Sequence, residues 1–186
     1  MKSRWSIRAR AGAAQPKNDR LRKLARSLDA LASQDQTAIR RARELVSLRQ
    51  QAARELHGIC ESFVQQLNGL LVETTVGLDP EQYPPDGFQD GGVNLFQINA
   101  RGRILQLEFE STVQATSTEN FRVPYILEGG VRSFNQQLLE KQVIEEQALF
   151  YTIERTRNLW RFFDARTYRS GVVNTDYLTS LMEQLL

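Results

Sequence analysis

The sequence predicts an α+β protein, with a long N-terminal amphipathic helix of the coiled-coil type before a small domain containing an antiparallel sheet and a C-terminal helix. Three observations support this class. Apolar residues recur at heptad spacing from Leu21 to Leu70, a cluster of glycine and proline follows, and beyond it the apolar period becomes two. The expected organisation is a disordered basic tail at 1–18, an oligomerising helix at 19–76, a linker at 77–92 and an α+β domain at 93–186.

The tail is defined by its charge. Residues 1–18 contain five basic residues and no acidic one, and Gly12 and Pro16 oppose helix formation there. A disordered tail is favoured over an organellar targeting sequence, because serine is sparse and no clear amphipathic pattern is present. Residues 1–54 hold fourteen Lys and Arg against four acids, whereas the rest of the chain holds ten against eighteen. A basic arm on an acidic body is typical of proteins with an anionic partner.

The long helix is predicted from a heptad frame that starts at Leu21. Twelve of its fifteen a and d positions are apolar, and Asp35, Arg49 and Gln66 are the exceptions. The e positions are apolar too, so the stripe is wider than a two-stranded seam and favours a bundle or an oligomer. The residues expected at the oligomer interface are Leu24, Leu28, Leu31, Ile39, Leu45, Leu56, Ile59 and Phe63.

The length of this helix decides how its stripe is buried. A continuous helix over residues 21–71 would be about 76 Å long, while the remaining residues would form a body only about 30 Å across. The helix must therefore pair with another chain or fold back on itself. The segment Ser33–Thr37 is the one plausible bend, but the heptad frame continues through it, which favours a homo-oligomer or a helical protein partner.

The opposite face of the helix is basic, which suggests contact with the phosphate backbone of a nucleic acid, without sequence readout. Solvated charge on a helix exterior is the plainer interpretation. The candidate nucleic-acid-binding residues are Arg4, Arg8, Arg10, Lys17, Arg22, Lys23, Arg26, Arg40, Arg41 and Arg54.

The segment after the linker begins with two predicted strands. Val93–Asn99 and Arg103–Ser111 alternate in polarity and are joined by a tight turn in which Gly102 takes the left-handed conformation. A third strand is expected at 121–127, at an edge or a bulge because of Pro124, before a turn or bulge at Gly129-Gly130.

The last third of the chain is less regular. A helix at 135–147 and a hairpin of 149–153 with 159–168 are expected, with one long helix over 135–163 as the alternative. Asn174 or Thr175 is expected to cap a final amphipathic helix. The domain should therefore contain about five strands and two helices.

Composition limits the chemistry. One cysteine, Cys60, and one histidine, His57, cannot form a disulfide framework or a Cys/His zinc site. They are expected to be a buried thiol and a histidine at the rim of the stripe. No apolar run or signal peptide suggests a membrane, so a cytoplasmic protein without metal or cofactor is expected.

The function most consistent with these features is a non-enzymatic assembly or adaptor protein. A protein bound to nucleic acid through the basic arm and helix is the alternative. A metal-dependent nuclease using Asp90, Glu108 and Glu110 is the third possibility, because strand carboxylates near an acidic loop can hold a metal.

Overall fold

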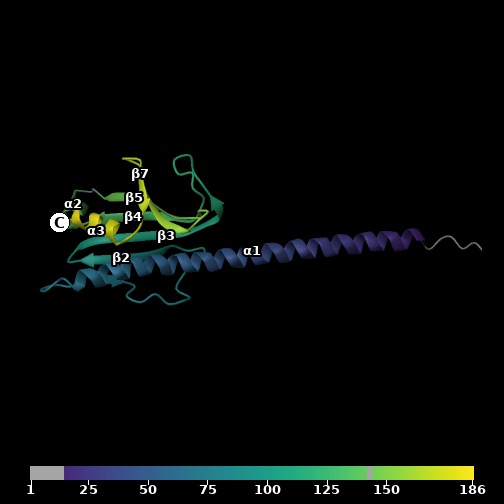
Figure 1. The fold of residues 1–186 in the computed structure, drawn as a ribbon, viewed down its shortest axis with the longest axis horizontal. Coiled ribbons are helices and arrows are strands. Elements are labelled where there is room, and N and C mark those ends of the chain that lie inside the picture. Colours follow the sequence, from purple (N-terminus) through teal and green to yellow (C-terminus); the bar gives the residue numbers. More distant parts are fainter. Residues whose placement is uncertain (1–14, 142–143) are drawn as a thin grey trace, which may run out of the picture. The chain divides into compact units, whose positions relative to one another are not determined.

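A computed structural model describes residues 15–141 and 144–186, and it confirms the α+β class. The chain divides into two compact units, Met1–Leu45 and Val46–Leu186. The second unit is called the body below. Helix α1 (Gln15–Asn68) continues through the boundary (Figure 1). Its residues 19–45 are called the first half, and residues 46–68, which belong to the body, the second half.

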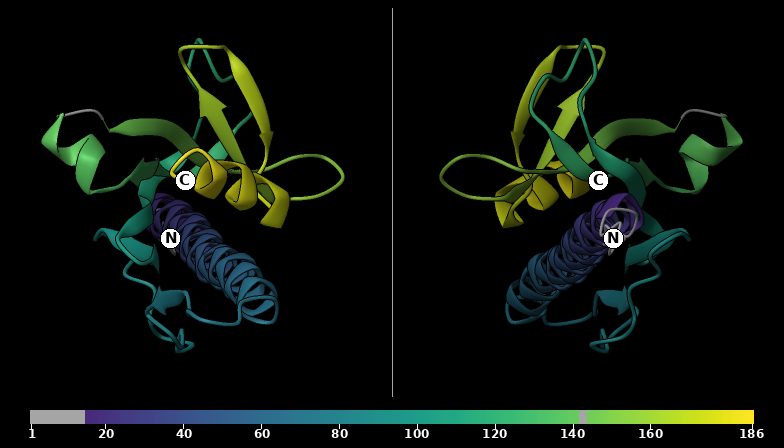
Figure 2. Two further views of the ribbon diagram at one scale, coloured as in Figure 1. Left: turned by 90° about the vertical axis from the view of Figure 1, so that its left-hand side faces the viewer. Right: turned by 90° about the vertical axis from the view of Figure 1, so that its right-hand side faces the viewer.

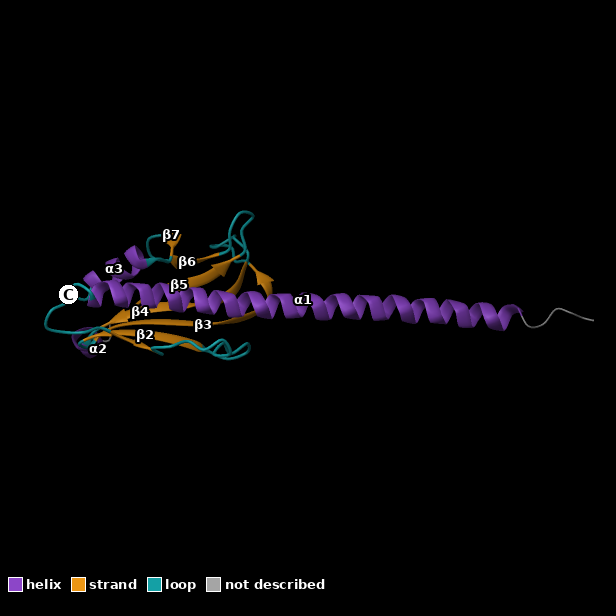
Figure 3. Ribbon diagram, turned by 60° about the horizontal axis from the view of Figure 1, so that its bottom comes forward, coloured by secondary structure: helices purple, strands orange, loops and turns teal. Residues whose placement is uncertain are grey.

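The body is built on a seven-stranded antiparallel sheet in which every strand pairs with its neighbours in the chain, from β1 to β7 (Figure 3). Its strands are β1 (Gly77–Asp79), β2 (Asn94–Ala100), β3 (Arg103–Thr116), β4 (Tyr125–Phe134), β5 (Glu145–Thr152), β6 (Leu159–Asp164) and β7 (Arg169–Val172). Two short helices accompany them, α2 (Gln136–Glu140) between β4 and β5 and α3 (Thr175–Glu183) after β7.

One face of the sheet forms the core of the body. Leu105, Leu107 and Phe109 of β3 are at most 1% exposed, whereas the side chains between them are not fully buried, as their alternation predicts. Trp160 on β6 donates a hydrogen bond of 2.8 Å from Nε1 to the carbonyl of Ala52 in α1. Two residues further along β6, Phe162 stacks on Tyr177 of α3 at 4.2 Å. The second half of α1 and α3 therefore pack on the same face (Figure 2).

Among the described residues, the cover found on the opposite face lies near one end of the sheet. Phe121, Tyr125, Phe150 and Phe163 form a small aromatic cluster there, with the Phe121 and Phe150 rings stacked at 4.5 Å. Phe121 belongs to the loop before β4, so this loop supplies a cover that the helices do not. The remainder of this face carries mainly polar side chains, with the exposed Leu95 and Val172 among them.

Helix α1 differs from its predicted bounds at both ends. It begins at Gln15 and includes Pro16. Proline is tolerated in a first helical turn, because the backbone N–H groups there have no partner within the helix and the missing N–H of proline costs no hydrogen bond. The helix ends at Asn68 rather than at residue 76, because the Asn68 side chain exchanges two hydrogen bonds with the backbone of Val76, at 2.9 and 2.7 Å. These bonds hold the chain in a turn and prevent another helical turn.

The segment predicted as a linker at 77–92 is part of the folded body. It contains β1, and its Phe88 is buried. The prolines and glycines of this segment exclude a helix but not a short edge strand. The compact body therefore begins at Val46, well before the predicted boundary at residue 93.

Two predictions about the centre of the sheet were wrong. Pro124 precedes β4, which lies inside the sheet and not at the expected edge, and the Pro124 carbonyl accepts a hydrogen bond from the Ile153 amide. The alternative expectation of a bulge agrees with a register shift just after this proline, between Tyr125 and Leu127. Gly129 and Gly130 lie inside β4 instead of forming a turn. A Cβ atom on Gly129 would lie 1.9 Å from the Glu108 carbonyl oxygen, so this glycine is required by the close approach of β3.

The later elements agree better with the sequence. The hairpin of β5 and β6 is confirmed, and the single long helix over 135–163 is excluded. The helix expected at 135–147 is limited to α2, because the chain from Glu145 onward pairs with β4. Asn174 caps α3 as predicted, its side chain accepting from the Tyr177 amide. Gly102 has the predicted positive φ, 84°.

Candidate functional site

The most unusual surface of the molecule is the apolar face of the first half of α1. Five large aliphatic side chains of this face are each more than half exposed: Leu21 (63%), Leu24 (55%), Leu28 (56%), Leu31 (54%) and Ile39 (53%). These five residues are called the exposed stripe. A regular row of this kind on one helix differs from isolated apolar surface residues, and contiguous apolar patches usually mark an interaction site.

The helix is continuous through this region. The segment Ser33–Thr37 is helical throughout, and the Thr37 hydroxyl donates a hydrogen bond of 2.9 Å to the Ser33 carbonyl inside the same helix. The polar side chain that could have broken the helix is thereby satisfied without leaving it. A helical hairpin at this point, the alternative to an intermolecular stripe, is excluded.

The predicted interface residues fall into two groups. Leu24, Leu28, Leu31 and Ile39 are exposed, and Leu45 is half-buried. By contrast, Leu56 and Phe63 are buried, and Ile59 is half-buried, in the second half, which packs on the sheet of the same chain. The sequence pattern alone could not separate the groups, because the body covers part of the stripe that the heptad frame treated as uniform.

Arg49, an exception in the heptad frame, anchors the second half to the body. Its guanidinium donates to Asp90 Oδ1 at 2.9 Å and also to the Thr112 carbonyl, and its side chain is only 7% exposed. Asp90 accepts a second hydrogen bond from the Ser111 hydroxyl at 2.6 Å. A buried charge needs such partners, so the apparent break in the apolar pattern is an intramolecular tether.

This pairing also bears on the nuclease hypothesis. Glu108 is held on the open sheet face by Arg132, at 3.2 Å, and Glu146 lies 3.3 Å from the same guanidinium. Asp90 is occupied by Arg49. Within the described residues, no group of three or more His, Cys, Asp or Glu side chains could hold a metal ion. The structure does not bring Asp90, Glu108 and Glu110 together as a metal site.

His57 and Cys60 are both structural parts of the body. The His57 ring nitrogen Nε2 donates to the Pro80 carbonyl at 2.8 Å, and the ring stacks on Tyr83 at 5.4 Å, so His57 is buried instead of lying at a rim. Cys60 is fully buried as predicted, and burial raises the pKa of its thiol to about 12. A thiol of this kind is a poor nucleophile at neutral pH.

The candidate nucleic-acid-binding residues of the helix are exposed to solvent wherever their side chains are described, in contrast to the buried Arg49. Arg22, Lys23, Arg26, Arg41 and Arg54 are exposed. Arg40 is exposed as well and lies 3.8 Å from Glu44, one turn later. Arg4, Arg8 and Arg10, with most of the predicted tail, lie outside the described residues. Lys17 belongs to the first turn of α1, where side chains are not described.

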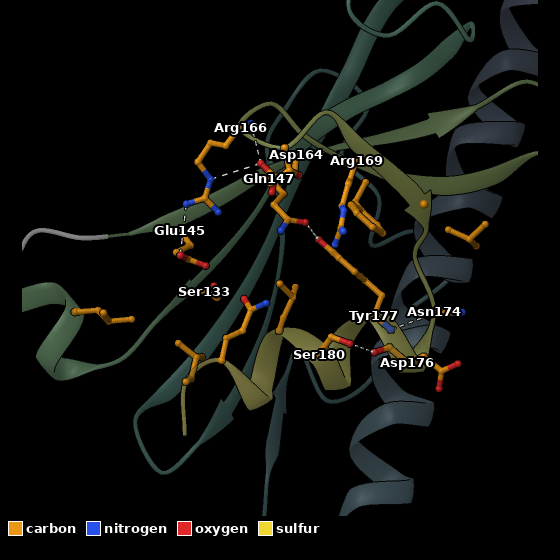
Figure 4. A pocket seen from close by; sticks show the side chains of 18 residues that line it. Ser133, Glu145, Gln147, Asp164, Arg166, Arg169, Asn174, Asp176, Tyr177 and Ser180 are labelled. Atoms are coloured by element: carbon orange, nitrogen blue, oxygen red, sulfur yellow. Dashed lines mark hydrogen bonds and ion pairs between the residues drawn. The ribbon is translucent and has the colours of Figure 1, made fainter.

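The body also contains a polar cleft of about 860 Å³ between α3 and the sheet edge formed by β5, β6 and β7 (Figure 4). Arg166 lies 3.5 Å from both Glu145 and Asp164, and the Tyr177 hydroxyl donates to Gln147 at 2.8 Å. Arg169 and Asp176 add one charge of each sign to the lining. Because the charges of the cleft nearly cancel and its polar groups bond to one another, the cleft selects neither an anion nor a cation. A sequence pattern could not have found it, since its residues come from elements spread between Ser133 and Leu185.

A second, more apolar groove of about 530 Å³ lies between the end of α1, the following loop and α3. Leu67, Leu70 and Met182 supply apolar walls, while Arg101 and Glu183 contribute opposite charges. It therefore offers apolar contact without a polar arrangement that would fix the orientation of a ligand.

Comparison of the chain with protein-family models, with curated proteins and with solved structures finds no match. Within the described part of the chain, no helix has the length and apolar character needed to cross a membrane. Among the surfaces described above, the exposed stripe is the best defined.

Proposed function

We propose that the protein is a non-enzymatic assembly or adaptor protein that associates through the exposed stripe and presents its α+β body to other molecules. The observation that supports this proposal is the row of five aliphatic side chains, each more than half exposed, on one face of an unbroken helix. Burying such a side chain completely is worth about 1.5–3 kcal/mol, so covering the exposed part of several of them favours association strongly.

The length of the helix adds a second argument. An uncovered amphipathic helix lacks its main source of stability in water, because most helical stability in proteins comes from packing of the apolar face. The first half spans about 40 Å at 1.5 Å per residue. A partner helix lying along it would cover the stripe and stabilise the helical state at the same time.

Light scattering combined with size exclusion tests this proposal directly. The wild type should have a mass that is a multiple of 21.3 kDa, and Leu24→Glu with Leu28→Glu should convert it into a folded monomer. Arg22→Glu with Arg26→Glu is the matched control, since it changes the same two turns away from the stripe and should leave the oligomer intact. A wild type that stays at 21.3 kDa at every concentration would refute the proposal.

A second candidate is association with the phosphate backbone of a nucleic acid. It is favoured by the exposure of Arg22, Lys23, Arg26, Arg40 and Arg41 on the first half of α1. Such binding would be insensitive to sequence and would weaken steeply as salt rises, because it depends on the release of counterions. Fluorescence anisotropy with a labelled DNA duplex should show weaker binding after Arg26→Gln, Arg40→Gln and Arg54→Gln. Absence of binding at low salt would exclude this candidate.

A further inference from the structure

Large and small residues are unevenly distributed along the a and d positions of the first half. The a and d positions are Leu21, Leu24, Leu28, Leu31, Asp35, Ala38, Ala42 and Leu45. Leucines occupy the N-terminal half of this window, whereas an acid and two alanines follow one another in the C-terminal half. This gradient determines how two copies of the helix can cover one another.

A parallel, in-register pair would place each residue opposite itself. Asp35 would then face Asp35, and Ala38 and Ala42 would each face their own copies in the next two layers. Two like charges in a seam are costly unless they are paired, and successive alanine layers leave voids that cost contact energy. The parallel arrangement therefore concentrates its defects in three consecutive layers.

Reversing one helix exchanges the roles of the a and d positions, so that each a residue faces a d residue of the other copy. The register that places Leu21 opposite Leu45 uses every core position in the window. The layers are then Leu21 with Leu45, Leu24 with Ala42, Leu28 with Ala38 and Leu31 with Asp35, each formed twice. Every layer contains a leucine, and each alanine faces a leucine that fills the space beside it.

The flanking positions agree with the same register. Ala25 lies beside Ile39 of the second copy, and Ala32 lies beside Ala32, so the additional apolar residues at the e positions pair small with large or small with small. At the g positions, on the other side of the seam, Gln34 lies beside Gln34 of the second copy and Ser27 lies beside Arg41 of the second copy. No two like charges face each other there. The strict seven-residue repeat is the period expected of a helix that supercoils around another helix.

We infer that the exposed stripe pairs two copies of this chain in antiparallel orientation, with Leu24 opposite Ala42 and Leu28 opposite Ala38 of the second copy. This inference rests on the proposed function, because it specifies the partner and the geometry of the same surface. The exposure of the stripe and the unbroken helix across Ser33–Thr37 provide the structural basis. The two copies are related by a twofold axis near Ser33, which makes the interface self-complementary.

Disulfide trapping tests the orientation. Leu24→Cys and Ala42→Cys are prepared as separate full-length chains, mixed in equal amounts and oxidised, with dimers detected on a non-reducing gel. The mixture should give a cross-linked dimer, and each variant alone should give none. Leu28→Cys mixed with Ala38→Cys is an independent pair in a second layer. The wild type is the control for Cys60, which is fully buried and should not cross-link.

The outcomes separate the inference from the proposed function. Cross-linking of Leu24→Cys with itself, or of Ala42→Cys with itself, would establish a parallel pair and overturn the antiparallel inference while leaving the oligomer in place. An oligomer in light scattering of the reduced variants without cross-links in either mixture would overturn the register. A monomeric wild type would remove the proposed function and the inference with it.

Discussion

The two halves of α1 have similar apolar patterns but different surroundings. Leu28 and Leu56 occupy the same heptad position, yet Leu28 is 56% exposed and Leu56 is fully buried. In the second half, the sheet of the same chain supplies the cover, with Trp160 and Arg49 fixing the helix through hydrogen bonds. In the first half, the corresponding face is open to solvent. An apolar stripe therefore shows which face a helix will bury, but it does not show what will cover that face.

The spacing of the apolar residues is shared by the two halves. In the second half, Leu56 and Phe63 are buried seven residues apart, and Ala52 and Phe63 eleven residues apart. In the first half, Leu21 and Leu28 are exposed seven residues apart, and Leu28 and Ile39 eleven residues apart. The cover that the body supplies, and not the period of the pattern, therefore separates the halves.

The largest expected effect comes from placing the same charge in each half. Leu56→Asp should unfold the body, since an unpaired carboxylate in the core costs more than about 4 kcal/mol. Leu28→Asp should change the stability of the monomer by no more than about 0.5 kcal/mol while abolishing the oligomer. Circular dichroism during thermal unfolding and light scattering measure the two effects. Equal loss of folding in both variants would contradict the comparison.

The tether of the second half gives the next largest effect. Asp90→Ala should destabilise the body by about 2 kcal/mol or more, because it leaves the Arg49 guanidinium buried with fewer partners. Arg49→Met should cost less, about 1 kcal/mol, since the aspartate that it frees is partly exposed and keeps its bond from Ser111. Denaturant unfolding measures both values. A larger loss of stability in Arg49→Met than in Asp90→Ala would show that Arg49 contributes mainly through packing.

Local features of this molecule could be predicted from the sequence, whereas long-range contacts could not. The alternation of β3, the turn at Gly102 and the cap at Asn174 were predictable, because each depends on neighbouring residues. The burial of Arg49 was not, since its partners Asp90 and Thr112 are 41 and 63 residues away. The glycines of β4 were misassigned for the same reason, because the close approach of β3 at Gly129 is a tertiary feature. The exposed stripe was found from spacing alone, but its limit near Leu45 depends on where the body begins.

A moderate effect is expected from repairing the acidic interruption of the first half. Asp35→Leu should tighten self-association by about tenfold or more, because it replaces a charge in the seam with an aliphatic side chain. Asp29→Leu is the matched control, since it makes the same change nearly two turns away and outside the a and d positions. Sedimentation equilibrium measures both affinities. Equal tightening in the two variants would show that general hydrophobicity, and not the seam, determines association.

The smallest expected effect concerns the helix itself. Gly58 lies on the exposed side of the second half, and a Cβ atom there would meet nothing within 4 Å. Gly58→Ala should therefore stabilise the body by about 0.5–1 kcal/mol, through reduced backbone freedom in the unfolded chain. The midpoint of denaturant unfolding should rise, and the mass of the oligomer should not change. A lower midpoint would indicate that this side of the second half is covered by another surface.

Hydrogen exchange of the wild type at low and high micromolar concentration tests the difference between the halves most directly. Amides of residues 46–68 should exchange slowly at both concentrations, because the body of the same chain covers them. Amides of residues 21–45 should exchange rapidly at low concentration, where an uncovered helix is marginally stable, and slowly at high concentration, where a second copy covers the stripe. Exchange of residues 21–45 that is independent of protein concentration would contradict the account.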